Sequence, residues 1–234
     1  MHFLFDNRFN ENDSRKRSLA ETAYDQIYRK IISLDYQPGQ NLEEKRLMTD
    51  LDIGRTPIRE ALLRLESVSM VTSEPNKGFV VRPITLQTTR AVFEALEILE
   101  LGVARLAVNH DNREILDQMA RVNESLRTAV DQVDIMRVVE LNHDFHMLFA
   151  QCSWNGYLMR ALLETRCEAN RLAYLSGSTD SDGGASLASH YASVLDQHQQ
   201  FIELIGARNP DSLRSVIRVH LDTFKRRIIH YLTA

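Results

Sequence analysis

The fold of this 234-residue chain is decided by one stretch, Gly54-Arg55-Thr56-Pro57-Ile58-Arg59-Glu60-Ala61-Leu62. Apolar residues recur in it at helical spacing, which predicts an amphipathic helix that buries Ile58, Ala61, Leu62 and Leu65. Arg55 stands just before the first turn of this helix and Arg59 lies one turn in. Both arginines are off the buried face. A helix start of this kind can bind phosphates and contact guanine edges in a DNA groove.

The flanking residues predict a winged helix-turn-helix at residues 18–83, after a flexible tail at 1–17. We expect Thr56 to cap the third helix and Pro57 to be its first residue. Pro38-Gly39 marks a turn between the first two helices. The predicted helices cover 19–33, 43–51 and the residues up to 67, and they are followed by strands at 71–73 and 79–82.

After Pro83 the pattern changes to long segments of helical period with few glycines or prolines. We expect an all-helical antiparallel bundle at residues 84–234, large enough for a core and an internal pocket. The fold class is therefore mainly α. The six predicted helices cover 85–108, 111–131, 134–151, 155–176, 185–207 and 210–232.

Composition sets limits on function. A net charge of −4 means that any affinity for DNA must come from a local cluster of basic residues. Cys152 and Cys167 lack metal-type spacing, and so few thiols favour a reducing compartment. The start does not resemble a signal peptide, and no apolar run reaches the ~18 residues of a membrane span. We expect a cytoplasmic protein without membrane contact.

Several residues are candidates for contact with double-stranded DNA. Arg55 and Arg59 can each donate two hydrogen bonds to guanine, and the Thr56 hydroxyl can bind a phosphate. A lone Arg-x-x-x-Arg is more often a solvated helix face, but the turn, the Thr-Pro helix start and the hairpin favour DNA. Arg46 and Arg64 are expected to be surface charges. The predicted interface consists of Lys45, Arg55, Thr56, Pro57, Arg59, Lys77 and Gly78.

Histidines on three predicted helices of the bundle form a candidate metal site. Asn142 and His146 lie four residues apart, so their side chains share one helix face. His198 and His220 lie at nearly equal heights on either side of the Asn209-Pro210 turn. Three imidazoles with an amide oxygen suit Zn²⁺ or Ni²⁺, and Mn²⁺ is possible. Two alternatives stay open: histidines in ordinary surface or core positions, and a register that uses His143 instead of Asn142.

The motif around Arg59, with Pro38-Gly39, Leu42, Leu65 and Lys77-Gly78, resembles the GntR family of bacterial transcription regulators. The later residues resemble the FCD ligand-binding domain of its FadR-type subgroup, and six helices look like the VanR-type branch. This resemblance rests on Leu99-Glu100, Arg105-Leu106-Ala107, Asn142, Phe145-His146, Asn155, His198 and His220. It implies a homodimeric repressor without catalysis, whose affinity for its operator is controlled by a small organic acid.

The resemblance also favours Asn142 with His146 as metal ligands. At four positions, however, the sequence differs from the family pattern. Ser69 and Gly54 replace a usual glycine and serine around the recognition helix. Leu96 replaces an arginine, and Asn142 replaces a metal-binding aspartate.

Arg166 and Arg171, on the fourth predicted helix of the bundle, could face the cavity and bind an anionic effector, or lie on a solvated face. Two other functions compete with the regulator. One is a metal-dependent enzyme, although the sequence has no His-Glu-x-x-His, nucleophile elbow or phosphate loop. The other is an architectural DNA-binding protein, which would need no ligand.

Overall fold

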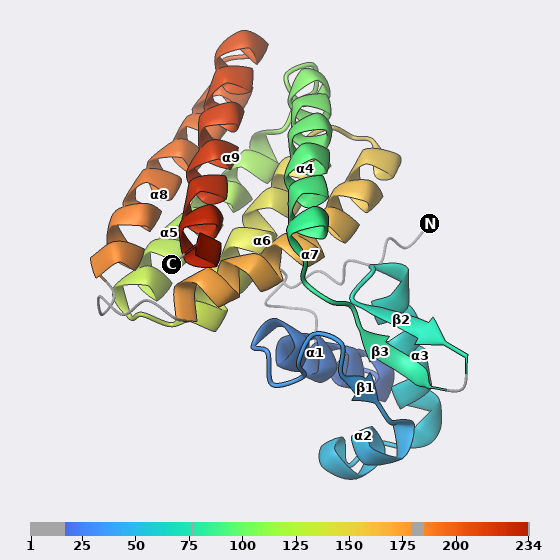
Figure 1. Ribbon diagram of the computed structural model, residues 1–234. Coiled ribbons are helices and arrows are strands. Elements are labelled where there is room, and N and C mark those ends of the chain that lie inside the picture. The colour runs from blue at the N-terminus through green and yellow to red at the C-terminus, as the bar shows by residue number, and fades with distance from the viewer. Residues whose placement is uncertain (1–16, 76, 179–184, 234) are drawn as a thin grey trace.

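The computed structural model describes residues 17–75, 77–178 and 185–233. It has two parts, a small module of helices and a sheet at residues 19–81 and a larger helical bundle at residues 86–233 (Figure 1). We call them the winged module and the bundle. The fold is mainly α, as the sequence predicts. Nearly all of the predicted tail at 1–17 lies outside the described residues.

The winged module contains three helices. The first, α1 (Leu19–Ile32), begins at a capping box, in which the Ser18 hydroxyl accepts from the Glu21 N–H and the Glu21 carboxylate accepts from the Ser18 N–H. Its apolar face packs against α3. The order of elements is α1, β1 (Asn41–Leu42), α2 (Glu44–Leu51), α3 (Arg55–Ser67), β2 (Val71–Glu74) and β3 (Gly78–Val81).

The sheet has one strand more than the predicted hairpin. Strand β1 pairs antiparallel with β3, which places Leu42 opposite Phe79 and gives the strand order β1-β3-β2. Gly39, at φ 82°, turns the chain back, and its N–H donates to the Val81 carbonyl at 2.8 Å. A strand of two residues has no alternation to recognise, so the sequence pattern missed it.

Helix α3 starts earlier than predicted. Gly54 is the N-cap residue and Arg55 is the first helical residue. The predicted cap by Thr56 and the predicted first position for Pro57 are therefore wrong, because these are the second and third residues of the helix. Glycine has no side chain that could cap, so the first amides of α3 lack a side-chain partner within the described residues.

The turn after α3 carries Ser69 at φ 60°, in the left-handed region where a glycine is favoured. This conformation is a physical reason for a glycine at this position in related sequences. The Ser69 hydroxyl donates a hydrogen bond to the Glu164 carboxylate of the bundle, which offsets part of the backbone cost. The turn is thereby one of the contacts between the two parts.

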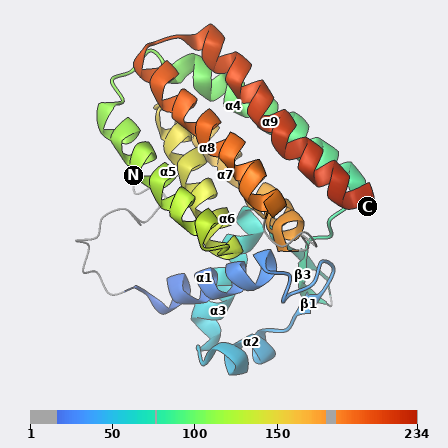
Figure 2. The ribbon, with the colours of Figure 1, turned by 90° about the vertical axis from the view of Figure 1, so that its left-hand side faces the viewer.

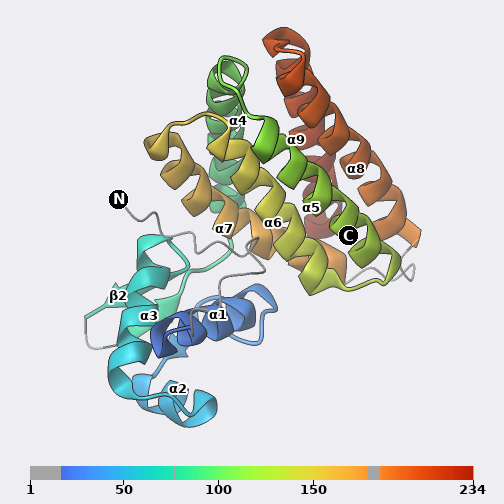
Figure 3. The ribbon, with the colours of Figure 1, turned by 180° about the vertical axis from the view of Figure 1, so that it is seen from behind.

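The bundle is a ring of six helices in the described residues. The packing order is α4–α7–α6–α5–α8–α9 and back to α4, and Figure 3 shows α5, α6 and α7 from behind. Each predicted helix agrees with the observed bounds within two residues. None of the helices in the described ranges is both long and apolar enough for a membrane span. The bounds are α4 (Leu86–Ala107), α5 (Arg113–Asp131), α6 (Ile135–Gln151), α7 (Gly156–Ser178), α8 (Ala185–Gly206) and α9 (Pro210–Thr233).

The apolar core of the winged module continues into the bundle. Ile27, Ile58 and Leu62 are fully buried within the module, and the same cluster includes Val139 of α6 and Cys167 of α7. Figure 2 shows α1 lying directly beneath the bundle. The contact between the two parts is therefore partly a shared hydrophobic core rather than a purely polar surface.

Candidate DNA-binding surface and histidine cluster

The two arginines at the start of α3 share one carboxylate. Arg55 Nε lies 2.9 Å from one oxygen of Glu44 in α2, and Arg59 Nη1 lies 3.8 Å from the other. The side chains of Arg55 and Arg59 nevertheless stay 71% and 61% exposed. Exposed ion pairs are weak and exchange readily with other anions. Glu44 therefore orients two guanidinium groups without removing them from the surface.

The other residues predicted to contact DNA also lie at the surface. Lys45 and Thr56 are exposed, and Pro57 is half-buried. Lys77 and Gly78 are exposed at the tip of the β2–β3 hairpin. A hydrogen bond to Glu74, at 2.8 Å, raises the pKa of Lys77. Lys77 thus keeps its charge, but a neighbouring carboxylate partly neutralises it.

The two basic residues predicted to be surface charges have partners inside the winged module. Arg46 forms an ion pair of 3.6 Å with Asp50 one turn later in α2. The guanidinium of Arg64 lies over the ring of Tyr24, 4.7 Å from its centroid. Among these basic side chains, Arg55 and Arg59 stand at the N-terminal end of α3, where a helix-turn-helix protein contacts bases.

Three histidines from different helices meet in the centre of the bundle. His146 of α6, His198 of α8 and His220 of α9 are buried, and each offers a ring nitrogen within 4.8 Å of the others. The Nε2 atoms of His146 and His220 are 3.2 Å apart. His198 stacks on Phe145, with ring centroids 3.7 Å apart. We call this group the histidine cluster.

Polar side chains behind the histidines hold two of the rings in place. His198 Nδ1 lies 3.2 Å from the Asn123 amide oxygen, and His220 Nδ1 lies 2.9 Å from that of Gln197. An amide oxygen only accepts, so these two rings carry a proton on Nδ1 and leave Nε2 as a lone pair. In the described part of the chain, Nε2 of His198 has no hydrogen-bond partner. Nitrogens presented in this way are typical of metal ligands.

The cluster is kept neutral by burial. Desolvation is the main cause that lowers the pKa of His146, His198 and His220 well below the ordinary value. For His198 and His220 a neighbouring imidazole lowers it further, and for His146 the second cause is Arg166. Neutral imidazole is the form that binds a metal ion.

A buried ion pair borders the cluster. Arg166 of α7 pairs with Glu100 of α4, and both side chains are buried. One amino group of Arg166 lies 2.6 Å from Nδ1 of His146, and Glu100 Oε1 lies 3.3 Å from the same nitrogen. Within the described residues, Glu100 Oε2 and Arg166 Nε have no hydrogen-bond partner. Unpaired polar atoms at this depth are costly, so a bound polar group that supplied their partners would be stabilised here.

Sequence reasoning missed three residues around the cluster: Glu100, Asn123 and Gln197. Glu100 could have been recognised in the sequence, because it is a charged residue on the apolar face of α4, between Leu96 and Val103. Asn123 likewise interrupts the buried face of α5. With these, all six helices of the bundle contribute a side chain to the cluster or its border.

The other residues in the bundle that the sequence singles out have different surroundings. Asn142 is half-buried, one turn before His146 on α6. Leu96 is fully buried one turn before Glu100 on α4. Of the two arginines predicted to bind an effector, Arg166 borders the cluster. Arg171 instead donates to the carbonyl of Arg82 in the linker between module and bundle, at 2.7 Å.

Comparisons with known proteins agree with this geometry. Residues 19–81 match the bacterial regulatory proteins of the gntR family, and residues 91–223 match the FCD domain. The Nta operon transcriptional regulator of Aminobacter aminovorans is 24% identical over 86% of this chain and 90% of its own length. The HTH-type transcriptional repressor RspR of Escherichia coli K12 is 22% identical over 89% of this chain and 88% of its own.

Solved structures show the same fold. McbR/YncC of E. coli superposes with a TM-score of 0.76 over 93% of this chain and 99% of that one, at 20% identity. A putative GntR regulator from Rhodococcus sp. RHA1 gives a TM-score of 0.70 over 92% and 99%, at 18% identity. The relatives are transcriptional regulators rather than enzymes. The chain thus belongs to the GntR family of bacterial DNA-binding transcription regulators, with an FCD effector-binding domain.

Proposed function

We propose that this regulator binds its operator as a homodimer and represses transcription, and that a small organic acid held at a metal ion in the bundle controls this binding. The single observation that carries the proposal is the histidine cluster, where three buried imidazoles direct ring nitrogens toward one point. A ligand-independent architectural protein has no use for such a site.

Operator recognition is assigned to the exposed end of α3. Arg55 and Arg59 can each donate a bidentate pair to guanine, worth about 1–3 kcal/mol of base discrimination. Thr56 and the open amides of the helix start would bind phosphates. Lys45, Pro57, Lys77 and Gly78 complete the interface, because they lie exposed or half-buried on α2, α3 and the hairpin tip. Glu44 would release the arginines as DNA phosphates approach.

The metal site is assigned to His146, His198 and His220, with the amide oxygen of Asn142 as a weaker fourth ligand. Three neutral imidazoles suit Zn²⁺ or Ni²⁺ better than Mn²⁺. The unpartnered Nε2 atom of His198 supports this assignment. Such an ion would supply a Lewis acid with open positions for a carboxylate. Because Asn142 is uncharged, we expect weaker binding than an aspartate would give.

Arg166 is the best-placed cation for the acid itself, because it borders the cluster and has an unpaired Nε atom. Its charge is already balanced by Glu100. We therefore expect the effector to be a hydroxy acid or sugar acid with one carboxylate rather than a strongly anionic ligand. Arg171, the other buried arginine of α7, already donates to the Arg82 carbonyl and to Glu168, so it is not available for a second carboxylate.

The experiment has two arms, each with its own control. Calorimetry of the metal-stripped protein measures Zn²⁺ binding in the unaltered chain, in His198→Ala and in the control His110→Ala. His110 stacks on Trp154 outside the cluster. We expect only His198→Ala to lose at least 10-fold in Zn²⁺ affinity. Equal Zn²⁺ affinity in all three proteins would refute the metal site.

The second arm uses an operator selected from random duplexes, with affinity followed by fluorescence anisotropy. A panel of hydroxy acids and sugar acids is then titrated into the complex of the Zn²⁺-loaded protein. We expect at least one acid to change operator affinity 5-fold or more, the usual lower range of allosteric coupling. If every acid leaves the affinity unchanged, control by an organic acid is refuted.

A further inference from the structure

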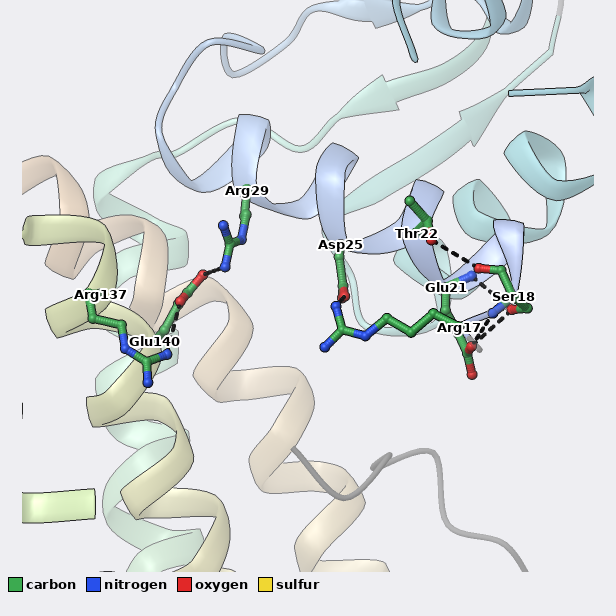
Figure 4. A network of polar contacts seen from close by, with 8 residues as sticks. All are labelled: Arg17, Ser18, Glu21, Thr22, Asp25, Arg29, Arg137 and Glu140. Carbon is green, nitrogen blue, oxygen red and sulfur yellow. Dashed lines mark hydrogen bonds and ion pairs between the residues drawn. The ribbon is translucent and has the colours of Figure 1, made fainter. Parts of the chain in front are cut away.

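The winged module rests on two helices of the bundle, α6 and α7. Arg29 of α1 forms an ion pair of 2.8 Å with Glu140 of α6, and Arg137 approaches the other oxygen of Glu140 at 3.5 Å (Figure 4). Val139 and Cys167 lie in the core of the module. These same two helices carry His146 and Arg166. The two helices that support the module therefore also contribute to the histidine cluster and its border.

Asn170 of α7 connects three helices through one amide group. Its Nδ2 atom donates to the Tyr28 hydroxyl of α1 at 2.8 Å and lies 2.9 Å from Nδ1 of His143 in α6. An amide has two N–H hydrogens, so both bonds can form at once. The Asn170 side chain is buried. A buried group that bonds two elements fixes their relative position, because a shift in either one breaks a hydrogen bond of the buried Asn170 amide.

Arg171, the next residue, holds the linker. Its guanidinium donates to the carbonyl of Arg82 at 2.7 Å and to Glu168 at 3.2 Å. The Arg171 side chain is fully buried, although it was expected at a cavity or in solvent. Arg82 follows the last strand of the module and precedes Pro83. Residues 170 and 171 thus contact the module at two places, at α1 through Tyr28 and at the linker through the Arg82 carbonyl.

These contacts lie one helical turn from the histidine cluster. Arg166 is four residues before Asn170 on α7, and His146 is three residues after His143 on α6. The pair His146–Arg166 borders the cluster, and the pair His143–Asn170 reaches the module. Two neighbouring polar contacts therefore join α6 to α7, one at the histidine cluster and one at the contact with the module. A movement of α7 that alters the first also alters the second.

We propose that Asn170 and Arg171 are the positioning residues of this regulator: they hold the winged module at a fixed angle on the bundle and relay the state of the histidine cluster to it. The relay, unlike the positioning, rests on the control by a bound metal and acid proposed above. Neither residue touches DNA. They act through the orientation of α3 in each protomer, and hence through the fit of a dimer to two half-sites.

The test measures a distance between the winged module and the bundle in the full-length protein, which changes when the module tilts. Spin labels are attached at Thr49→Cys in α2 and Ser193→Cys in α8, two exposed positions, while the native Cys152 and Cys167 are buried. The labelled protein is mixed with an excess of unlabelled protein, so that the distance within one protomer is measured, and we expect one narrow distance distribution in the parent. Asn170→Leu and Arg171→Met should broaden it. Tyr28→Phe removes a single hydroxyl and keeps the ring, so it is the mildest change and should broaden the distribution less.

Matched controls come from the far end of the bundle, where α4 meets α5. The connection between α4 and α5 lies at the end of the bundle away from the module (Figure 1). Asn109→Leu and Arg113→Met make the same chemical changes at exposed positions there. We expect the Asn170 and Arg171 variants to lose about 5-fold in affinity for a two-half-site operator and to keep their affinity for a single half-site. Distributions as narrow as those of the controls would overturn the positioning.

A final arm tests the relay with Zn²⁺ alone. We expect Zn²⁺ to shift the label distance in the parent and to leave it unchanged in Asn170→Leu and Tyr28→Phe, although both variants bind Zn²⁺ with parent affinity. Equal shifts in parent and variants would overturn the relay and leave the proposed function intact. If Zn²⁺ binds but shifts the distance in no protein, the relay is overturned as well; control by the acid is then judged by the acid titration above and the positioning by the first arm.

Discussion

The start of α3 and the centre of the bundle handle charge in opposite ways. On α3, Arg55 and Arg59 share Glu44 at the surface, where exchange of partners costs little. In the bundle, Arg166 and Glu100 are out of contact with water and face neutral histidines. The first arrangement is ready to meet an anion as large as DNA. The buried pair selects a ligand that supplies hydrogen-bond partners, because each buried polar atom needs one.

The largest difference in stability between the two regions should appear when the carboxylate of Glu100 or of Glu44 is removed. Glu100→Ala leaves a buried guanidinium unpaired and should cost about 3–5 kcal/mol of the free energy of unfolding. Glu44→Ala, which removes the partner of exposed arginines, should cost at most about 1 kcal/mol. Urea unfolding of both variants measures the contrast. Adding Arg166→Met to Glu100→Ala should restore part of the loss, whereas equal costs for the two carboxylates would contradict the comparison.

Acid should destabilise the bundle through its histidines. Their pKa values are lowered in the folded state, so they stay neutral there while the unfolded chain takes up protons below about pH 6.5. The stability of the metal-free protein is therefore retained above that pH and falls below it, by up to about 1.4 kcal/mol per histidine and pH unit.

Urea midpoints of the metal-free protein at pH 7.5 and pH 5.5 check the direction. His198→Asn removes one of the three titrating rings and should reduce the pH dependence accordingly. A stability that rises toward pH 5.5 would show that these rings are protonated in the native state.

On the exposed side, Arg59→Ala should lower operator affinity by about 10- to 100-fold, the worth of one bidentate contact, and relax the preference at one base pair. Lys45→Ala should instead weaken all sequences about equally and lower the salt slope by about 1. Anisotropy with operator variants separates the two patterns. Arg113→Ala is the control, since its exposed side chain pairs with Asp111 on the bundle.

The smallest effect is expected at the helix start itself. Gly54→Ser supplies the missing cap of α3, and a Cβ at this position meets nothing within 4 Å. We expect a gain of about 0.5 kcal/mol in stability. Thermal unfolding measures it, and a loss would mean that the serine hydroxyl competes with another contact of the turn.

The helices could be predicted from the sequence, because the apolar spacing that marks them involves residues close together in the chain. The apolar spacing after Gly54 and the long periodic segments after Pro83 gave the helices within a few residues. Errors arose where short elements carry no period, as in β1, or where a cap has no side chain, as at Gly54.

The candidate site was only partly accessible in this way. Equal spacing of His198 and His220 from a turn predicted that two helices would bring them together, and they do meet. The partners Asn123, Gln197 and Glu100 come from positions far apart in the chain, so only the packing of six helices reveals them. Arg171 is the clearest case: sequence alone cannot tell a cavity from a linker carbonyl 89 residues away.

Because Val139 and Cys167 complete the core of the winged module, the two parts of the chain are expected to unfold together. A fragment ending at Val81 would expose to water the apolar side chains that contact Val139 and Cys167, and it would lose the carbonyl contact at Arg82. Folding of the module would then wait for α6 and α7, which come later in synthesis. The nascent chain would thus acquire its ability to bind DNA only after the part that senses the effector has formed.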